Sequence, residues 1–351
     1  MNLNAGILRN SLFLFFRIKF LLSVIAILLS FSLAHADVLE LDLKSKEKLS
    51  EFSKNITLSI KSGINGNPEQ AALGLVDASL DYLLPGIGED APDWMKRIEL
   101  EWQVRENFAP EYAITTVQPL WETEDLLDTV FTQLSLRRYE LFGRDRDVAN
   151  IGLGYRRLLF NDTVLIGANS FYDYEFDINH QRSSFGFEAK WAGLDFSTNK
   201  YWGLSKAHTA DQSQGIEEEP LDGHDIELTG QVPYLPWARV TGRRYWWKTK
   251  TASEDIKGWE ASINMDLFQN LQVEAGVNSD NFIKDNNNHE VFMMTRFHFN
   301  FNRPVATSTQ VVSKDPWLMR DMKDYRFDKV KRENKIIVER RSGGITIARG
   351  T

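Results

Sequence analysis

The side chains best able to do chemistry in this sequence stand in the run Asp222-Gly223-His224-Asp225. An aspartate beside a histidine can act in general acid–base catalysis or help to bind a metal ion. Either role needs further partners, and no serine or second histidine stands at a useful spacing from this run. We therefore interpret it as the end of a solvated loop, and we expect neither catalysis nor a metal or other cofactor.

Three other polar or glycine-rich clusters allow similar alternatives. Asp173 and Glu175 could form a catalytic carboxylate pair, and Glu217-Glu218-Glu219 could bind a cation. The glycines of GLG (152–154) lack the strand–turn–helix setting of a nucleotide-binding loop. We interpret the first pair as interior or rim charges, the second as a solvated loop, and the glycines as small residues that ease strand curvature.

Overall composition removes further classes of function. The chain contains no cysteine, which excludes disulfides and thiolate metal ligands. Its formal net charge of −8 argues against a nucleic-acid partner, because such binding needs a basic surface.

The elements that position these residues are long amphipathic strands. In GWEASINMDLFQNLQVEAGVN (258–278), apolar and polar residues alternate on both sides of a short break. A period of two places the apolar residues on one face of a strand and the polar residues on the other. Twelve such strands are predicted, at 97–105, 111–118, 128–139, 147–159, 162–173, 183–191, 194–203, 224–233, 236–248, 257–267, 270–279 and 290–301.

The length and connections of these strands indicate a membrane barrel. Most run nine to thirteen residues, near the ~9–11 needed to cross a bilayer at a tilt. Their connections alternate between short turns and long polar loops such as 141–147 and 203–223, and the long connection 119–128 is the one exception. Such asymmetry is typical of outer-membrane barrels. We predict an all-β, 12-stranded antiparallel transmembrane β-barrel over 97–301; the alternative is a secreted β-sandwich.

The first 96 residues are of a different kind. Basic residues, the apolar run 20–33 and the sequence Ala34-His35-Ala36 predict a secretory signal peptide over 1–36, cleaved between Ala36 and Asp37. The alternative is an uncleaved anchor helix. Residues 37–96 are predicted to form a short helical periplasmic segment, and the location expected for the barrel is the outer membrane.

Three sequence blocks suggest a family. TVFTQLSLRR (129–138), NIGLGYRRLLFND (150–162) and LIGANSFYDYEF (165–176) resemble the β-domain of the inverse autotransporters, the intimin and invasin adhesins. The resemblance implies a twelve-stranded barrel, a linker that returns through the pore, and a passenger displayed outside the cell.

A candidate linker covers residues 302–341. The family's linker pattern is matched by Val330, Arg332, Asn334, Ile336 and Glu339, and dense charges that include Arg320 and Arg326 suit a polar lumen. A helix of ~20 residues would cross a bilayer core of ~30 Å. The alternative is a solvated periplasmic helix. Only the short tail 342–351 follows, so no immunoglobulin-like passenger is expected in this sequence.

Polar residues on the inner faces of the strands are expected to pair across the lumen. The predicted lumen-facing residues are Arg137, Arg156, Arg244, Glu260, Asn264 and Arg296.

The resemblance implies a translocator that threads its C-terminal segment to the cell surface. The expected partners are outer-membrane lipid and the barrel-assembly machinery, with a separately encoded passenger or a host receptor as further candidates. The alternatives are export of a passenger in trans, a stand-alone adhesin or invasion factor acting through loop 203–223, and a diffusion porin.

Overall fold

The computed structural model describes residues 93–105, 110–268, 271–281, 289–298, 312–317, 320–342 and 344–346. The chain divides into two compact units, Met1–Trp94 and Met95–Thr351. The predicted signal peptide, its cleavage site at Ala36 and Asp37, and most of the segment 37–96 lie outside the described residues. A short helix, α4 (Asp93–Lys96), stands at the boundary of the two units. No helix in the described part of the chain is long and apolar enough to span a membrane.

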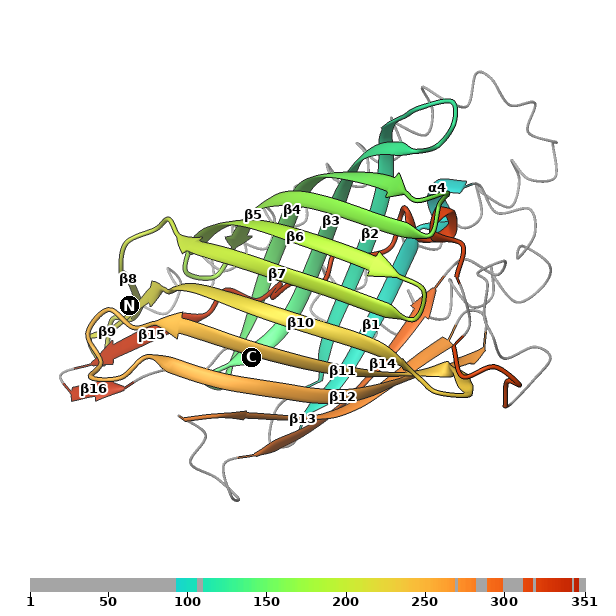
Figure 1. The fold of residues 1–351 in the computed structure, drawn as a ribbon. Helices are drawn as coiled ribbons and strands as arrows, with labels where there is room; N and C mark the ends of the chain where they lie inside the picture. Colours follow the sequence, from blue (N-terminus) through green and yellow to red (C-terminus); the bar gives the residue numbers. More distant parts are fainter. Residues whose placement is uncertain are drawn as a thin grey trace, which may run out of the picture. The chain divides into compact units, whose positions relative to one another are not determined.

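Twelve strands of the second unit close into an antiparallel barrel in the order β1-β14-β13-β12-β11-β10-β7-β6-β5-β4-β3-β2 (Figure 1). The predicted fold class is thereby confirmed. The barrel strands are β1 (Ile98–Arg105), β2 (Glu111–Glu122), β3 (Asp128–Leu141), β4 (Arg144–Leu159), β5 (Val164–Glu175), β6 (Gln181–Trp191), β7 (Leu194–Gly203), β10 (Asp222–Val232), β11 (Leu235–Lys248), β12 (Ile256–Phe268), β13 (Leu271–Asp280) and β14 (Glu290–His298).

Two predicted loops are wrong, and both corrections lengthen the strands. Strand β2 continues to Glu122 through a register shift between Pro119 and Trp121, so the exceptional connection 119–128 becomes a short turn. The predicted loop 141–147 is a tight turn at Phe142 and Gly143, with φ of 55° and 69°. Two successive positive φ angles match the twist of a hairpin.

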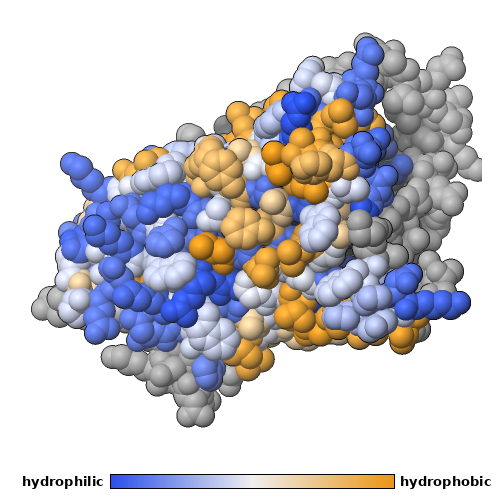
Figure 2. Space-filling model, viewed as in Figure 1, coloured by the Kyte–Doolittle hydropathy of each residue, from blue (hydrophilic) through white to orange (hydrophobic). Residues whose placement is uncertain are grey.

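The barrel exposes apolar side chains and buries polar ones. Leu153, Phe187 and Val240 on the outer face are each more than half exposed. On the inner face, Arg156 and Arg182 are buried. Figure 2 shows hydrophobic residues gathered over the barrel wall and a hydrophilic surface toward the end that carries β8 and β9. This inside-out distribution is that of a barrel whose wall faces lipid and whose lumen is polar.

Successive connections lie at opposite ends of the barrel. The short-turn end carries the β2–β3, β4–β5, β6–β7 and β10–β11 turns, and the long-loop end carries the β7–β10 and β11–β12 connections. At the long-loop end, β8 (His208–Asp211), β9 (Ile216–Pro220), β15 (Val338–Ser342) and β16 (Gly344–Thr346) form a four-stranded sheet. Part of the loop 203–223 is therefore ordered by pairing with the C-terminal segment.

Residues 320–337 run through the lumen from the short-turn end to the long-loop end (Figure 1). After a 3-10 helix, η3 (Met322–Tyr325), no helix interrupts residues 328–337. The amide of Met322 donates to the carbonyl of Asp162 at the short-turn end (3.2 Å), and the carbonyl of Ile337 accepts from Leu221 at the other (2.9 Å). The helical crossing is thus corrected to an extended one, in which ~10 residues suffice at ~3.3 Å each.

Candidate functional site in the barrel lumen

The centre of the lumen is a buried cluster around Asp173 of β5. Its carboxylate accepts from the Nε atom of Arg182 at 2.8 Å and from the Nη2 atom of Arg332 at 2.7 Å. Asn150 donates a further bond of 2.7 Å. Because one carboxylate bridges a wall arginine and a linker arginine, it ties the linker to the barrel at a fixed register. Buried charges are tolerated only when they are paired and hydrogen-bonded.

The wall also recognises the backbone of the linker. Arg182 donates to the carbonyls of Glu333 (2.7 Å) and Lys335 (2.6 Å). Gln133 accepts from the amide of Val330 (2.8 Å), and Asn199 donates to the carbonyl of Lys331 (2.9 Å). An extended chain without strand neighbours has unpaired amides and carbonyls, and these side chains replace the missing ladder. Backbone recognition of this kind holds an extended segment with little dependence on its side chains.

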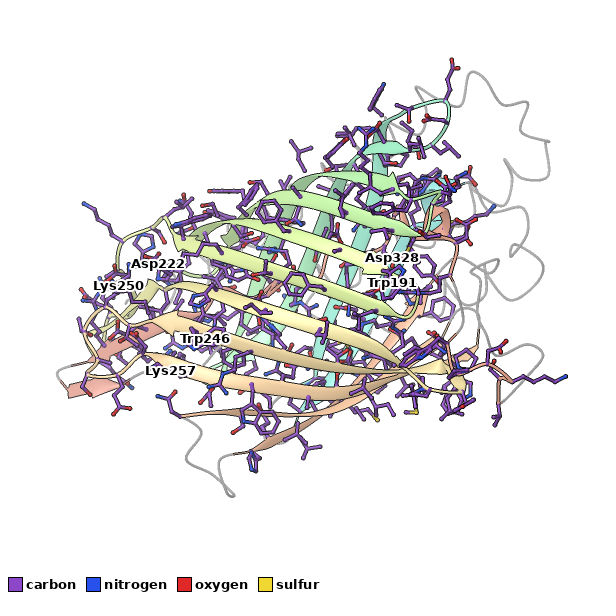
Figure 3. The ribbon with its side chains drawn as sticks, viewed as in Figure 1. Trp191, Asp222, Trp246, Lys250, Lys257 and Asp328 are labelled. Atoms are coloured by element: carbon purple, nitrogen blue, oxygen red, sulfur yellow. The ribbon has the colours of Figure 1, made fainter. Side chains whose placement is uncertain are left out.

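Ion pairs accompany the linker from Arg320 to Lys335. At the short-turn end, Arg320 pairs with Asp195 (2.6 Å) and Arg326 with Glu122 (3.1 Å). Further inside, the pairs are Asp328–Lys190 (2.6 Å), Lys331–Glu227 (2.7 Å), Glu333–Arg243 (3.1 Å) and Lys335–Glu111 (2.9 Å), while Lys329 contacts Glu99 and Glu101. Figure 3 labels Asp328 toward the short-turn end and Lys250 at the long-loop end. Each charged residue from Asp328 to Lys335 therefore has an opposite charge on the wall.

Aromatic rings support two of these arginines, and glycines make room for the rings. The Arg332 guanidinium lies 4.2 Å from the centre of the Phe171 ring, and that of Arg156 lies 4.3 Å from the centre of the Phe131 ring. A Cβ atom at Gly152 would lie 2.2 Å from the Phe171 ring. The glycines of the GLG run thus permit the close approach of aromatic side chains from the neighbouring strands.

We predict that Gly152→Ala destabilises the folded barrel by ~1–3 kcal/mol, because the added methyl group displaces Phe171 from Arg332. The measurement is thermal unfolding in detergent, followed by the heat-dependent shift in gel mobility. Gly242→Ala is the matched control, since nothing lies within 4 Å of a Cβ atom there. Equal stability of the two variants would contradict the proposed role of Gly152.

Two buried glutamates hold the linker where it leaves the lumen. Glu339 of β15 accepts from the backbone amides of Lys250 (2.6 Å), Thr251 (3.0 Å) and Ala252 (2.9 Å) in the β11–β12 loop. Glu218 of β9 accepts from Arg146 (2.9 Å) on the wall and from Arg340 (2.6 Å) on β15. Together with the β9–β15 pairing, these contacts fasten the emerging chain to the rim.

The Glu218 contact predicts a loss of stability in acid. Burial alone would raise the pKa of Glu218, but contacts with His180, Arg146 and Arg340 outweigh it and hold the pKa at about 2. Because the pKa is lowered, the ionised carboxylate stabilises the fold by roughly 3 kcal/mol at any pH above its ordinary pKa of ~4.5. This contribution is lost as the pH falls toward 2.

The measurement is the difference in thermal stability between the wild-type protein and Glu218→Gln. We expect it to be constant above pH ~5 and to vanish near pH ~2, because a protonated carboxyl and an amide are alike in charge. Glu217→Gln, an exposed position on the same strand, is the control. A difference that does not change with pH would refute the assignment.

The structure places most of the predicted site residues in this lumen. All seven predicted linker residues make the contacts given above or pack on the wall: Val330 against Val117, Phe131 and Phe171, and Ile336 against Tyr139, Leu141 and Val148, while Asn334 accepts a bond of 3.1 Å from Asn150 through its carbonyl. Of the predicted wall residues, Arg137 pairs with Glu101, Arg156 with Glu188, and Arg296 with Glu274 and Asn264, and Glu260 also stands on an inward-facing position of β12.

Among the predicted lumen-facing residues, Arg244 was assigned to the wrong face. It lies exposed on the outer face of β11, where its guanidinium is 5.6 Å from the centre of the Trp246 ring. Its neighbour Arg243 faces inward and pairs with Asp225 (2.7 Å). The prediction also missed four residues that contact the linker backbone: Arg182, Gln133, Asn150 and Asn199. The only signal in the sequence was that each stands at an inward-facing position of the alternating pattern.

A closed barrel with an apolar wall, a polar lumen and its own chain in that lumen is the architecture of an outer-membrane β-barrel. The sequence profile described as "Inverse autotransporter, beta-domain" matches residues 82–334. The chain belongs to this family.

The relatives of this chain include intimin, invasin and an inverse autotransporter adhesin. Intimin of Citrobacter freundii is 27% identical over 234 residues, which are 63% of this chain and 23% of intimin. Invasin of Yersinia enterocolitica is 24% identical over 53% of this chain and 21% of invasin. The inverse autotransporter adhesin YeeJ of Escherichia coli K12 is 26% identical over 71% of this chain and 11% of YeeJ. The chain thus spans about a fifth to a quarter of the length of intimin and invasin.

Among solved structures, one from work on the in-meso crystallization of membrane proteins aligns with 70% of this chain and 98% of its own, at 21% identity and a TM-score of 0.55. This similarity supports the fold.

Proposed function

We propose that this protein is a translocator that passes its own C-terminal segment through the barrel to the cell surface and then retains it there. The observation that carries the proposal is the path of residues 328–338, which are held by wall side chains from one end of the lumen to the other. An even number of strands leaves both ends of the barrel sheet at the short-turn end, which is periplasmic in outer-membrane barrels. A chain that emerges at the long-loop end therefore has to cross the lumen.

The contacts also suggest how passage is made directional. The periplasm holds no ATP, so retention outside has to favour the forward state. Pairing of β15 with β9 and capture of the Glu339 carboxylate by the β11–β12 loop become available only after the segment has emerged. These contacts favour the emerged state without any further energy source.

Single cysteines test the proposal cleanly, because the natural chain has none. Thr346→Cys lies beyond β15, and Lys314→Cys lies in a segment bonded to Tyr234 at the short-turn end. A membrane-impermeant maleimide on intact cells is expected to label Thr346→Cys, and to label Lys314→Cys only after permeabilisation. Labelling of Lys314→Cys alone on intact cells would refute the proposed direction.

We also propose two further functions. One is export of a separately encoded passenger, and the other is adhesion to a host receptor. The first is favoured if deleting this barrel removes another protein from the cell surface. The second draws on the names of the relatives and on the sheet of β8, β9, β15 and β16 at the long-loop end, and is tested by host-cell binding of bacteria that lack only residues 208–220.

A further inference from the structure

The outer wall carries a basic and aromatic patch where four adjacent strands reach the long-loop end. Lys200 of β7, His224 of β10, Trp246 of β11 and Lys257 of β12 are successive neighbours across the sheet. Arg244 stands one step toward the wall centre, and Lys248 one step toward the loops. We call these six residues the rim patch. All but Trp246, which is partly exposed, are exposed.

The rim patch is predominantly basic. Among the residues that the structure describes, no ion pair involves Lys200, Arg244, Lys248 or Lys257, and the nearby Asp222 lies 3.9 Å from Lys250 instead. Cations elsewhere at the same end differ: Arg138 pairs with Asp147 (2.8 Å) and Arg144 with Asp211 (2.6 Å). Asp222, which stands opposite Lys248 in the β10–β11 pairing, is the acidic neighbour of the rim patch, and the four cations outnumber it.

The position of the patch indicates the kind of partner. Directly toward the short-turn end, the same strands expose Phe196, Leu228, Val240 and Ile263, each at least 39% accessible, which suit the hydrocarbon of the membrane. The patch thus lies where acyl chains end and lipid headgroups begin. Two of its rings, those of His224 and Trp246, are stacked with centres 4.7 Å apart (Trp246 and Lys257 are labelled in Figure 3).

We propose that the rim patch is a binding site for a phosphorylated glycolipid of the outer leaflet. The lysines and Arg244 neutralise phosphate groups, since clustered basic residues at a membrane surface attract anionic headgroups and guanidinium groups match phosphate geometry. The ring faces of His224 and Trp246 cover the apolar side of a sugar, and the apolar residues below them contact the acyl chains. The side chains replace the divalent cations that otherwise bridge such phosphates, so binding persists in a chelator.

The test titrates the purified, folded full-length protein in detergent with diphosphorylated lipid A and with the same lipid after phosphatase treatment, both in EDTA. The wild-type protein is expected to prefer the phosphorylated lipid by at least about tenfold. The variant K200Q/R244Q/K248Q/K257Q is expected to lose this preference, and K200Q/K257Q to lose part of it. R138Q/R144Q, which removes paired cations at the same end, is the matched control and is expected to keep it.

Folding of each variant is checked by its heat-dependent gel mobility, and the milder K200Q/K257Q variant serves if the fourfold variant does not fold. Equal affinity for the two lipids, or a preference unchanged in the rim-patch variants, would overturn the proposal. Equally tight binding of phosphatidylglycerol at matched charge would overturn the assignment to a glycolipid. None of these measurements depends on passage of the linker, so they stand apart from the translocation test.

Discussion

Asp173→Asn is expected to reduce the stability of the folded barrel by about 3–5 kcal/mol. The carboxylate is fully buried and lies between Arg182 and Arg332, and its neutralisation leaves two buried guanidinium groups without their common partner. Removing one member of a buried charge cluster is more damaging than its pairwise attraction suggests, because the remaining charges stay desolvated. The measurement is the temperature of the mobility transition in detergent.

Two further variants separate this effect from a general loss of charge. Asp211→Asn removes an aspartate from an exposed pair with Arg144 and is expected to leave the transition unchanged. The double variant Asp173→Asn/Arg332→Gln is expected to recover part of the loss, because only Arg182 then lacks its partner. A double variant as damaged as the sum of its single changes would show that the two residues act independently.

Deletion of residues 312–351 is expected to turn a closed barrel into a conducting one. Within residues 328–338 the linker carries Lys329, Lys331, Arg332 and Lys335 against Asp328 and Glu333, a net charge of +2 (four minus two). Its removal leaves the wall carboxylates Glu99, Glu101, Glu111, Asp173 and Glu227 without these cations. The resulting pore is expected to favour cations.

Planar-bilayer recording tests both parts of this prediction. The full-length protein is expected to conduct at the detection limit, and the truncated protein to show sustained openings with a reversal potential shifted toward cation selectivity. Deletion of residues 343–351 alone keeps the lumen segment and is the control, expected to remain closed. A conductance that rises little in the longer deletion would contradict a plugging role for the linker and would favour the diffusion-porin alternative.

The strand pattern was predictable because lipid outside the barrel and the polar lumen inside it impose alternating apolar and polar residues. Every residue of a barrel strand faces lipid or lumen, so alternation persists over the whole span, and most strand limits follow from sequence to within three residues. The pattern fails where both faces are polar or aromatic. In the run RRYWW (243–247) neither parity is more apolar, which is why Arg244 was assigned to the lumen in place of Arg243.

The rest depends on pairings between distant segments. Strands β9 and β15 are short and charged and pair with each other although they are far apart in the sequence, with Val338 opposite Pro220 and Arg341 opposite Glu217. The linker is extended for a similar reason: Arg182, Asn150 and Gln133 on the wall satisfy its backbone, which removes the need for helical hydrogen bonds. No local feature of the sequence 328–337 indicates that these wall residues will pair with its backbone.

The geometry of β9 and β15 has a mechanical consequence. A load that reaches β15 through its distal end at Ser342 opposes β9, which is anchored at its proximal end, where Pro220 leads into the barrel strand β10. The two strands are therefore sheared, so their hydrogen bonds share the force and do not break one after another. An attachment of this kind resists traction, such as the drag on a cell in flowing fluid, better than its small number of residue pairs suggests.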